Sequence, residues 1–425
     1  MKKSLILVIE GALIGILAGL TAVLYRYCLT WAEGGLYQIL NFIQGNGPAI
    51  ALWFVALILM GCVVAQIVRM EPMSSGSGIP QVCGEVQGEL NPSWWRVILA
   101  KFVGGTMCIF GGLSLGREGP SIQLGAMAAK GYSRLLGYDK KREIHLLSCG
   151  AGAGLAAAFN APLAGILFIL EEICHTFDRA ILAAGLIATV CADFVSKLFF
   201  GQSAIFSFST ATIPLQNYWL LILFGILLGL AGAFYNLVMV KTQALFQHLK
   251  KIPQEIRIAF VFVISGILGL TLPQVLAGGH SMIILLEHGN PALLTIALLL
   301  VVKFLFSALS FGSGAPGGIF FPLLILGAYC GALFGNAAME MLPLSADLLP
   351  QFIVLGMAGL FAGIVRAPIT GIVLITEMTG NMHRMLDIAV VSGIAYIVAN
   401  LLGSKPIYTS LLENIIRRKK EQEST

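Results

Sequence analysis

Gly116-Arg117-Glu118-Gly119-Pro120 places two charged residues between glycines in a chain that is otherwise strongly apolar. A Gly-Pro step cannot continue a helix, but proline suits the first turn of a new one, and residues 121–129 have a helical composition. We therefore expect Glu118 just ahead of a helix N-terminus, where free backbone N–H groups and the positive end of the helix dipole favour anions. At membrane depth, an external anion and the Glu118 carboxylate would compete for one place.

The composition of the chain is that of an integral membrane protein. Of its 425 residues, 57% are hydrophobic and only 11% are charged, and the mean hydropathy is +0.89, whereas soluble domains carry about 25% charged residues. The net charge of +5 is concentrated in short loops and at the chain ends, which indicates membrane orientation rather than nucleic-acid binding. Lysines near both ends predict that both termini are cytoplasmic.

Neither the cysteines nor the histidines predict a metal site. Most of the eight cysteines lie within apolar runs, and no pair of the six histidines has metal-ligand spacing on a helix. We interpret the cysteines as small buried side chains rather than a disulfide framework, and the histidines as interfacial polar residues.

Hydropathy divides the chain into many helices, several of them too short to cross a bilayer. Residues 4–30 are predicted to be a retained first membrane helix rather than a signal peptide, because the stretch contains Glu10 and lacks a small-residue cleavage site. Residues 33–48 are predicted to be a polar connection facing the outside. Short, tilted or broken helices are expected at 97–112, 121–136, 144–159 and 162–174. The predicted fold class is an all-α multi-pass membrane protein.

The chain contains an internal repeat. Residues 160–171 align without gaps to residues 366–377, 206 positions further on, and both copies end in a glutamate, Glu171 and Glu377. Broken segments at matching places in two halves indicate inverted-topology repeats with a transport site near the middle of the membrane. We place the halves at about 1–200 and 215–405. Residues 406–425 are predicted to form a C-terminal cytoplasmic helix and basic tail.

Three glycine-rich breaks, at residues 76–80, 116–120 and 314–320, each precede a helical run. Each can present free backbone N–H groups, whose partial charges bind a weakly hydrated anion without the trapping strength of a full Lys or Arg charge. The alternative is that the glycines only permit close helix crossing. Three such breaks in one chain argue against that alternative.

Four motifs together resemble the signature elements of the CLC chloride channel and transporter family. They are Gly76-Ser77-Gly78-Ile79-Pro80, residues 116–120, residues 314–320 and Lys405-Pro406-Ile407-Tyr408. They occur in the family's order, with compatible spacing, and the match covers essentially the whole chain. The resemblance implies the CLC fold as a single transmembrane domain over 1–425, without the paired cytoplasmic regulatory domains of many eukaryotic members. It also implies a homodimer with one anion pathway per subunit, in a prokaryotic-type plasma (inner) membrane.

The resemblance also implies an anion site. The Ser77 hydroxyl and the Tyr408 phenol would donate to a central anion, joined by the backbone N–H groups of Ile319 and Phe320. In the family, serine at the position of Ser77 accompanies chloride preference, while proline accompanies nitrate. The motif residues Gly76, Arg117 and Gly119 belong to the same predicted anion-binding set.

Glu118 matches the gating glutamate of the family, which occupies an anion site when ionised and leaves it when protonated. The residues themselves support this role, because a carboxylate that competes with chloride for helix N-termini gives up its place when it takes a proton. The alternative is a simple ion pair between Glu118 and Arg117. We do not favour it, because neighbouring residues in a turn rarely face each other.

Glu172 matches the internal proton-transfer glutamate of the exchangers in this family, where the channels generally carry a different residue. Glu171 is predicted to be structural, packing at a helix end like its repeat mate Glu377. The alternative is that Glu171 and Glu172 form a solvated helix end. The choice between exchanger and channel depends largely on Glu172.

The sequence therefore predicts a proton-coupled chloride antiporter, driven by ion gradients with no organic cofactor or metal, and not an enzyme. A passive chloride channel on the same fold is the alternative. A membrane-embedded hydrolase is a rival from another class, but no Gly-x-Ser-x-Gly or His-Glu-x-x-His motif appears. One departure from the family pattern is that Gln81 and Cys83 stand where several relatives carry acids. We therefore expect Lys101, within an apolar helix, to be buried and unpaired.

Overall fold

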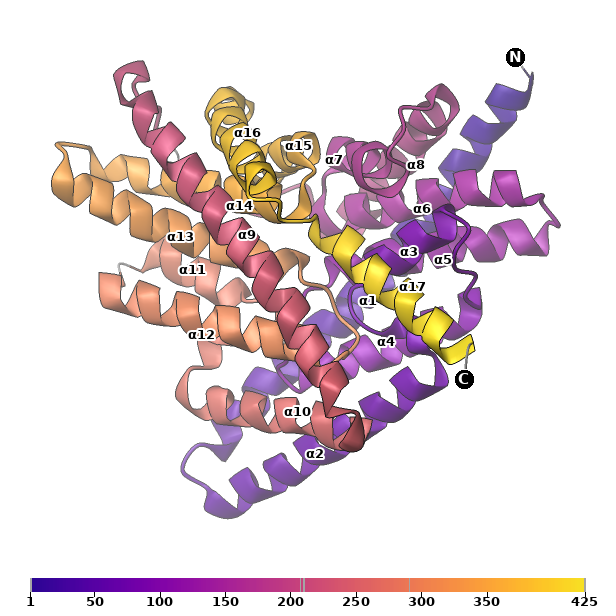
Figure 1. Cartoon of the computed structure of the whole chain (residues 1–425), viewed down its shortest axis with the longest axis horizontal. Helices are drawn as coiled ribbons and strands as arrows, with labels where there is room; N and C mark the ends of the chain where they lie inside the picture. Colours follow the sequence, from indigo (N-terminus) through magenta and orange to yellow (C-terminus); the bar gives the residue numbers. More distant parts are fainter. Residues whose placement is uncertain (1, 207, 209–210, 290, 424–425) are drawn as a thin grey trace.

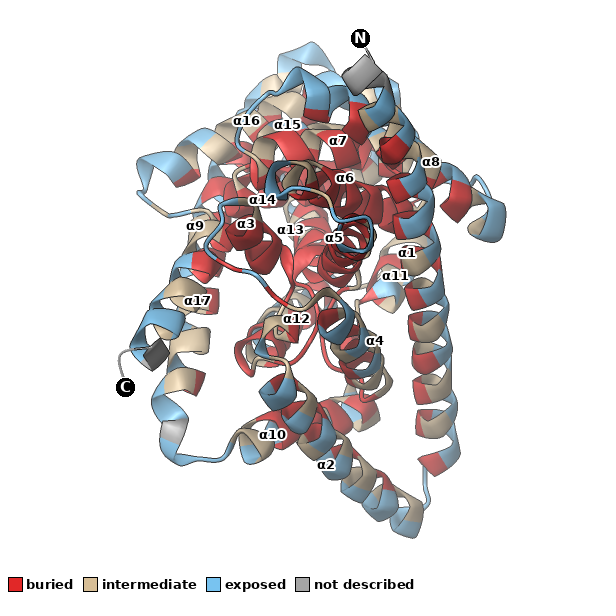
Figure 2. Ribbon diagram, turned by 90° about the vertical axis from the view of Figure 1, so that its right-hand side faces the viewer, coloured by how far each residue is buried: buried red, intermediate tan, exposed pale blue. Residues whose placement is uncertain are grey.

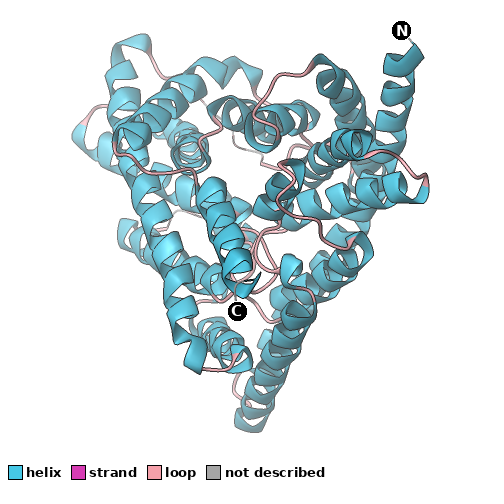
Figure 3. Ribbon diagram, turned by 45° about the vertical axis from the view of Figure 1, so that its right-hand side comes forward, coloured by secondary structure: helices cyan, strands magenta, loops and turns pink. Residues whose placement is uncertain are grey.

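The computed structural model describes residues 2–206, 208, 211–289 and 291–423, and these are mostly helical (Figure 3). The helices are α1 (Lys2–Ile43), α2 (Gly47–Met70), α3 (Ile79–Val86), α4 (Trp94–Phe110), α5 (Glu118–Leu135), α6 (Lys140–Phe159), α7 (Pro162–Phe168), α8 (Arg179–Phe200), α9 (Tyr218–His248), α10 (Gln254–Thr271), α11 (His280–His288), α12 (Leu293–Gly312), α13 (Phe320–Met341), α14 (Leu349–Val365), α15 (Pro368–Thr379), α16 (Met385–Leu401) and α17 (Ile407–Glu423). A π-helical turn, η2 (Ile169–Ile173), continues α7. The described residues contain no β-strand, only two isolated bridges.

Nine of the described helices are long and apolar enough to cross a membrane. Buried side chains concentrate in the central helices α5, α6, α13 and α14, whereas α1, α2 and α10 are exposed along one side (Figure 2). Large apolar side chains on the exposed faces of α1 and α2 include Leu20, Leu24, Leu52 and Leu59. An apolar exterior around a polar-containing centre is the arrangement of a protein that faces lipid. The predicted all-α multi-pass fold class is confirmed.

Helix α1 is longer than the sequence predicted. It runs without interruption to Ile43, and only three residues separate it from α2, so the polar connection expected over residues 33–48 was wrong. The reason is the helical spacing of Leu36, Leu40 and Ile43, which are all at most 4% exposed. Their apolar stripe continues the face that packs on the protein, so the helix does not stop at Glu33.

The chain folds as two inverted-topology repeats. In Figure 1, α3 to α8 gather on the right and α11 to α16 on the left, and α7 and α15 meet between them. The first residues of α5 and α13, Glu118 and Phe320, lie 202 positions apart, and each precedes a proline by two positions. The short helices α3 and α11 both follow a glycine in the left-handed region, Gly78 (φ 92°) and Gly279 (φ 97°).

The two glutamates of the repeat, Glu171 and Glu377, each cap the first turn of a helix in the other half of the chain. Both carboxylate oxygens of Glu377 accept hydrogen bonds from the first turn of α7, from Leu163 N at 3.1 Å and Ala164 N at 2.8 Å. Glu171 accepts from the first turn of α15, from Ile369 N at 3.3 Å and from Thr370 N and Oγ1 at 2.8 Å each. Each carboxylate thus satisfies free N–H groups at the positive end of the opposite helix. The prediction that Glu171 packs at a helix end like Glu377 is confirmed.

The three glycine-rich breaks meet at the centre of the molecule. Gly116 and Gly318 form an antiparallel bridge, with N–H to carbonyl distances of 2.6 and 2.8 Å. Gly76 accepts from Gly317 N at 3.0 Å and donates to Ala315 O at 3.3 Å. Segments far apart in the sequence thereby bring the N-termini of α3, α5 and α13 together.

Candidate functional site

The N-termini of α3 and α5 touch at Ser77 and Gly119. A Cβ atom added to Gly119 would lie 2.8 Å from the Ser77 carbonyl oxygen and 2.9 Å from Ser77 Cβ, so only glycine permits this approach. Ser77 is 2% exposed, and its Oγ accepts a hydrogen bond of 3.3 Å from Ile79 N. The two predicted motifs therefore form one site.

The loop before α3 is held by side-chain donors that bond to its backbone carbonyl oxygens. Lys101 Nζ donates to Ser74 O at 2.6 Å and to Gly76 O at 2.8 Å. Gln81 Nε2 donates to Ser75 O at 2.7 Å, and Gln123 Nε2 donates to Met73 O at 2.8 Å. Four successive carbonyl oxygens are therefore occupied by donors, which fixes the backbone that leads to Ser77 and α3.

The expectation for Lys101 was only half right. Lys101 is fully buried, as predicted, and no ion pair to a carboxylate is found for it among the described residues. Its ammonium is nevertheless satisfied, because two carbonyl oxygens accept from it. Gln81 supports the same loop by donating to the neighbouring carbonyl of Ser75.

Glu118 is buried at the first position of α5. Its side chain is 1% exposed, and Oε1 lies 3.6 Å from Arg117 Nε. Oε2 has no hydrogen-bond partner among the described residues and lies above Gly116, beside Phe321. A carboxyl group in this position is shielded from lipid and faces the converging breaks.

The sequence argument against an Arg117–Glu118 ion pair was wrong. Arg117 has right-handed helical dihedral angles (φ −91°, ψ −17°) as the residue before α5. Side chains on a helix lean toward its N-terminus, so the carboxylate of Glu118 turns back toward Arg117. The arginine itself is 27% exposed, and the pair joins a buried acid to a more accessible base.

Phe320 and Ile319 lie at the start of α13, fully or almost fully buried. The Phe320 ring packs among the rings of Phe159, Phe168 and Phe361, with centroids 4.9 to 6.5 Å away. This packing fixes the first turn of α13, whose free N–H groups have no helical partner. The backbone groups predicted to contact an anion are therefore held rigidly.

Tyr408, the second residue of α17, is 1% exposed, and its hydroxyl has no hydrogen-bond partner among the described residues. The phenol interacts electrostatically with both Glu118 and Glu172. Helix α17 packs on α3, the helix that begins two residues after Ser77. The tyrosine is thus a buried donor with unused capacity, within electrostatic range of the two acids that the sequence selected.

Glu172 lies in the π-helical turn η2, with 4% of its surface exposed. π-helical turns within α-helices are frequent at functional sites. The backbone carbonyl of Glu172 is 3.7 Å from Cys83 Sγ of α3. Burial of Glu172, together with the capping contacts of Glu171, is at variance with the alternative in which both residues form a solvated helix end.

Sequence reasoning missed Lys303, which repeats the arrangement of Lys101. Lys303 Nζ donates to Val275 O and to Ala277 O, at 2.9 Å each, in the loop before α11. It is fully buried and stands 202 positions after Lys101. A second lysine within an apolar helix, at a spacing within four residues of the 206-residue offset of the repeat, was the signal that could have found it.

A cavity of about 430 Å³ opens beside Glu118. The charged and polar residues around it include Arg26, Glu33, Arg117 and His280. Neither Ser77, Tyr408 nor Glu172 lines it. Arg26 and His280 were not selected from the sequence, because each stands alone in its segment without a motif.

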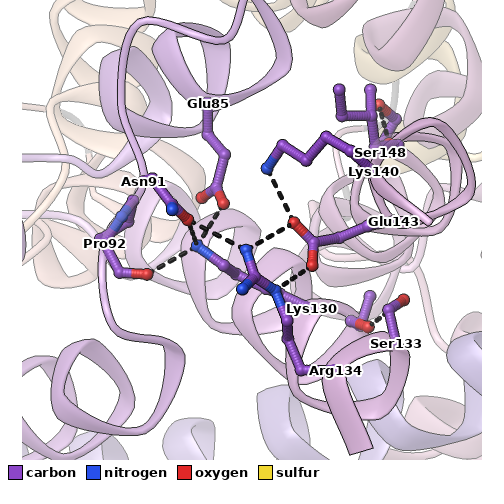
Figure 4. Close-up of polar contacts among 11 residues, drawn as sticks. Glu85, Asn91, Pro92, Lys130, Ser133, Arg134, Lys140, Glu143 and Ser148 are labelled. Atoms are coloured by element: carbon purple, nitrogen blue, oxygen red, sulfur yellow. Dashed lines mark hydrogen bonds and ion pairs between the residues drawn. The ribbon is translucent and has the colours of Figure 1, made fainter. Parts of the chain in front are cut away.

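A second cluster of charges lies at the far end of α3 (Figure 4). Glu85, fully buried, pairs with Lys130 of α5, whose ammonium also donates to Asn91 Oδ1 at 2.9 Å and Pro92 O at 2.6 Å. Beside it, Glu143 accepts from Arg134 and from Lys140. The cluster fastens the C-terminal part of α3 to α5 and α6, while Ser77 and Gly119 touch near the N-terminal ends of α3 and α5.

A membrane-spanning helical bundle in which helix N-termini converge on a buried carboxyl group has the architecture of an ion-transport protein. A model of the family described as voltage gated chloride channel matches residues 56–400. The chain belongs to this family, and the CLC resemblance predicted from the motifs is confirmed.

Relatives match over almost the whole chain. It is 36% identical to the H(+)/Cl(-) exchange transporter ClcA of Vibrio campbellii, over 96% of this chain and 90% of the relative. It is 34% identical to the protein of that name from Klebsiella pneumoniae, over 100% of this chain and 92% of the relative. The crystal structure of a slow cyanobacterial Cl-/H+ antiporter superposes with a TM-score of 0.93 at 30% identity, covering 97% of this chain and 99% of that one.

A crystal structure of a eukaryotic CLC transporter also shares the fold. Its TM-score is 0.79 at 23% identity, over 97% of this chain and 74% of that one. The predicted CLC fold is therefore confirmed.

Proposed function

We propose that this chain is a proton-coupled chloride antiporter in which Glu118 is the gating and proton-carrying group. The observation that carries the proposal is the position of Glu118, a buried carboxyl at the first residue of α5, among the converging N-termini of α3, α5 and α13. Relatives named H(+)/Cl(-) exchange transporter, and a similar structure described as a Cl-/H+ antiporter, support Cl⁻ and H⁺ as the exchanged ions.

The anion is held by neutral donors. The Ser77 hydroxyl, the Tyr408 phenol and the backbone N–H groups of Ile319 and Phe320 surround it, and Gly76, Arg117 and Gly119 shape its surroundings. Buried N–H and O–H dipoles bind chloride without the strength that would trap it. Lys101 contributes at a distance, by holding the carbonyl oxygens of the Ser77 loop.

Glu118 exchanges places with chloride. As a carboxylate it competes for the same helix N-termini, and as a neutral acid it loses that attraction and gives up the place. Each passage of an anion past Glu118 therefore requires the carboxyl group to take up or release a proton. This requirement couples the two ion flows.

Glu172 transfers protons on the other side of the anion site. A buried carboxyl in η2 is costly in a membrane unless it has a function. Tyr408, which interacts electrostatically with both acids, lies between the two proton-transfer steps. The passive channel is not favoured, because the chain retains an acid at the position of Glu172 and the relatives carry exchanger names.

The proposal extends to the setting of the protein. It is a single domain over residues 1–425, with halves at about 1–200 and 215–405 and a cytoplasmic helix and tail at 406–425. It resides in the plasma (inner) membrane with both termini cytoplasmic, as a homodimer with one pathway per subunit. Chloride, favoured by Ser77, and protons are its substrates, and ion gradients drive transport without a cofactor or metal.

The test is a chloride gradient imposed on reconstituted liposomes, with chloride and pH followed together. The unmodified protein is expected to move protons uphill. Glu118→Gln is expected to keep chloride flux and lose coupled proton movement, because the amide cannot carry a proton. Glu172→Gln is expected to give the same uncoupled flux.

Glu171→Gln is the matched control for Glu172→Gln, since the neighbouring acid caps α15. Transport by Glu171→Gln should remain coupled once the amount of folded protein is accounted for. Uphill proton movement that persists in Glu118→Gln would refute the assigned role. If it persists only in Glu172→Gln, the inner proton-transfer role is lost while the gating role of Glu118 stands.

A further inference from the structure

Three side chains with unused donors lie where α9, α10 and α17 meet. They are Gln247, Arg257 and Arg418, which we call the Arg418 cluster. The Nε2 atom of the glutamine and the Nε atoms of both arginines are buried, and none has a hydrogen-bond partner among the described residues. Burying an N–H group without an acceptor costs free energy, so the cluster is a place where an acceptor from outside the chain would be favoured.

The packing of α9 on α17 brings Gln247 close to Arg418. One turn earlier, Gln243 Oε1 accepts a hydrogen bond of 3.1 Å from Asn414 Nδ2. The two helices are in contact and run in the same direction (Figure 1). Gln247 follows Gln243 by four residues, and Arg418 follows Asn414 by four, which is about one helical turn in each case. The second pair of side chains therefore lies one turn beyond the first.

Arg257 joins the other two from the start of α10. Its Nη1 donates to the backbone carbonyl of Phe246, the residue before Gln247, and this bond ties the start of α10 to the end of α9. The guanidinium of Arg418 interacts electrostatically with that of Arg257. The three donors thus come together from helices that are far apart in the sequence.

The charges around the cluster are mostly positive. Arg418 lies within electrostatic range of two other arginines and of one acid, Glu421. Glu255, which interacts with Arg257, is also held by Arg69 of α2, with Oε1 2.5 Å from Nη2. Guanidinium groups close together repel each other unless an anion lies between them. The planar donors of arginine match the oxygens of a phosphate group especially well.

A large apolar surface borders the cluster. Large apolar side chains at the end of α9, at the start of α10 and in the connection between them are 37 to 57% exposed; they are Leu245, Leu249, Ile252, Ile256 and Phe260. A free phosphate ion would make no use of such a surface. The acyl chains of a phospholipid would cover it while the headgroup reaches the arginines.

The same end of the helices has the residues of a membrane–water interface. Trp95 of α4 is 48% exposed, and Arg96 Cζ lies 5.3 Å from the centroid of its ring. Arg96 is within electrostatic range of Glu71, which follows the last residue of α2. Arg69, two residues before Glu71, is the side chain that holds the start of α10. Because tryptophan and arginine are typical of the headgroup level, the Arg418 cluster lies at the depth of lipid phosphates.

We propose that the Arg418 cluster binds the phosphate of an anionic phospholipid. Arg257 and Arg418 donate to its oxygens, Gln247 adds a neutral donor, and the acyl chains lie along the apolar surface at the end of α9. In the orientation proposed above, the lipid belongs to the cytoplasmic leaflet. It fastens α17, the helix that carries Tyr408, to α9 and α10. Binding of this lipid does not depend on which ions the protein exchanges.

Thermal unfolding of the full chain in a neutral detergent identifies the ligand. Phosphatidylglycerol is expected to raise the unfolding temperature, because it carries both a net negative phosphate and acyl chains. Phosphatidylcholine, which has no net charge, and inorganic phosphate, which has no acyl chain, are expected to have little effect. Stabilisation by inorganic phosphate equal to that by phosphatidylglycerol would show an ion site rather than a lipid site and overturn the proposal. Equal stabilisation by phosphatidylcholine would overturn it as well.

Native mass spectrometry with added phosphatidylglycerol locates the site. Arg257→Gln combined with Arg418→Gln is expected to weaken lipid binding about tenfold or more. Arg417→Gln is the matched control, because it removes an exposed arginine from the neighbouring position of the same helix, and it should weaken binding less than about twofold. If Arg417→Gln weakens binding as much as Arg418→Gln does, general positive charge attracts the lipid and the proposed site is wrong.

Gln247→Leu guards against a loss of folding in the arginine variants. It changes no charge, and the Nε2 atom that it removes has no partner within the described residues. It is expected to weaken phosphatidylglycerol binding about threefold while the lipid-free unfolding temperature stays the same. Unchanged binding in Gln247→Leu, or in the double arginine variant, contradicts the proposal.

Discussion

Lys101 and Lys303 make the same pair of contacts in the two halves of the chain. Each is fully buried, and each donates to the carbonyl oxygens of two residues, one residue apart, in the loop before a short helix. The loops they hold differ in the residue that leads into that helix, because Ser77 precedes α3 while Gly278 stands at the matching place before α11. The scaffold is therefore repeated, and the side chain that would contact an anion is present in one half alone.

The same contrast appears at the helices that meet across the central bridge. Helix α5 begins at Glu118 and α13 begins at Phe320, so an acid in one half corresponds to an aromatic ring in the other. Phe320 is locked among three rings, whereas one oxygen of Glu118 has no hydrogen-bond partner among the described residues. The repeat thus provides a fixed aromatic ring, Phe320, in one half and a carboxyl group that can take up a proton, Glu118, in the other.

The largest expected effect concerns a buried ion pair of the first half. Glu85 and Lys130 form a buried ion pair. With α11 aligned to α3 at Gly279 and Gly78 (201 positions) and α13 aligned to α5 at Phe320 and Glu118 (202 positions), the matching positions in the second half are Leu286 and Ala332. Glu85→Leu or Lys130→Ala alone is expected to lower the free energy of unfolding by about 3–5 kcal/mol, because each leaves a buried charge unpaired. Thermal unfolding in detergent measures the loss.

The double variant Glu85→Leu/Lys130→Ala is the control, because it transplants the residues of the second half. It should recover most of the stability, since removing both charges removes the desolvation cost of the pair. A double variant as unstable as the sum of the single ones would mean that the pair positions α3 and α5 in a way that apolar packing cannot replace.

Much of the fold could be predicted from the sequence because its signals are local. Pro120 and the glycines of the breaks mark where helices begin, and the copies that end in Glu171 and Glu377 reveal the repeat. The Glu85–Lys130 pair and the cavity around Arg26 could not be predicted, because their partners are far apart in the chain and no short motif records the contact. Arg117 was misjudged because the direction of a side chain depends on helix geometry, which spacing in the sequence does not give.

Replacing either buried lysine, Lys101 or Lys303, by methionine should have an effect of intermediate size on stability. Lys101→Met leaves the Ser74 and Gly76 carbonyl oxygens without their donor, at a cost of about 1–3 kcal/mol, and the loop that orients Ser77 loosens. Chloride affinity at the central site, measured by calorimetric titration of the purified protein, is expected to fall about tenfold or more.

Lys303→Met is the comparison for Lys101→Met. It should cost similar stability, but chloride affinity at the Ser77 site should change less than about threefold, because its loop borders the cavity beside Glu118, which Ser77 does not line. Equal losses of chloride affinity at the Ser77 site in both variants would contradict the prediction that only the loop held by Lys101 orients that site.

The smallest expected effect compares how much stability the two capping glutamates contribute, one from each half. Glu171→Gln and Glu377→Gln each remove a charge that caps the helix of the opposite half. An amide keeps one acceptor oxygen but loses the charge that interacts with the helix dipole, so each variant should lose about 1 kcal/mol of stability. Glu171 also accepts from Thr370 Oγ1 at 2.8 Å, and Glu171→Gln should therefore cost slightly more.

Thermal unfolding of Thr370→Val, alone and combined with Glu171→Gln, isolates that hydrogen bond: the difference between the two glutamate variants should vanish when Thr370 is valine. A difference that survives the valine would place the asymmetry elsewhere in α7 or α15.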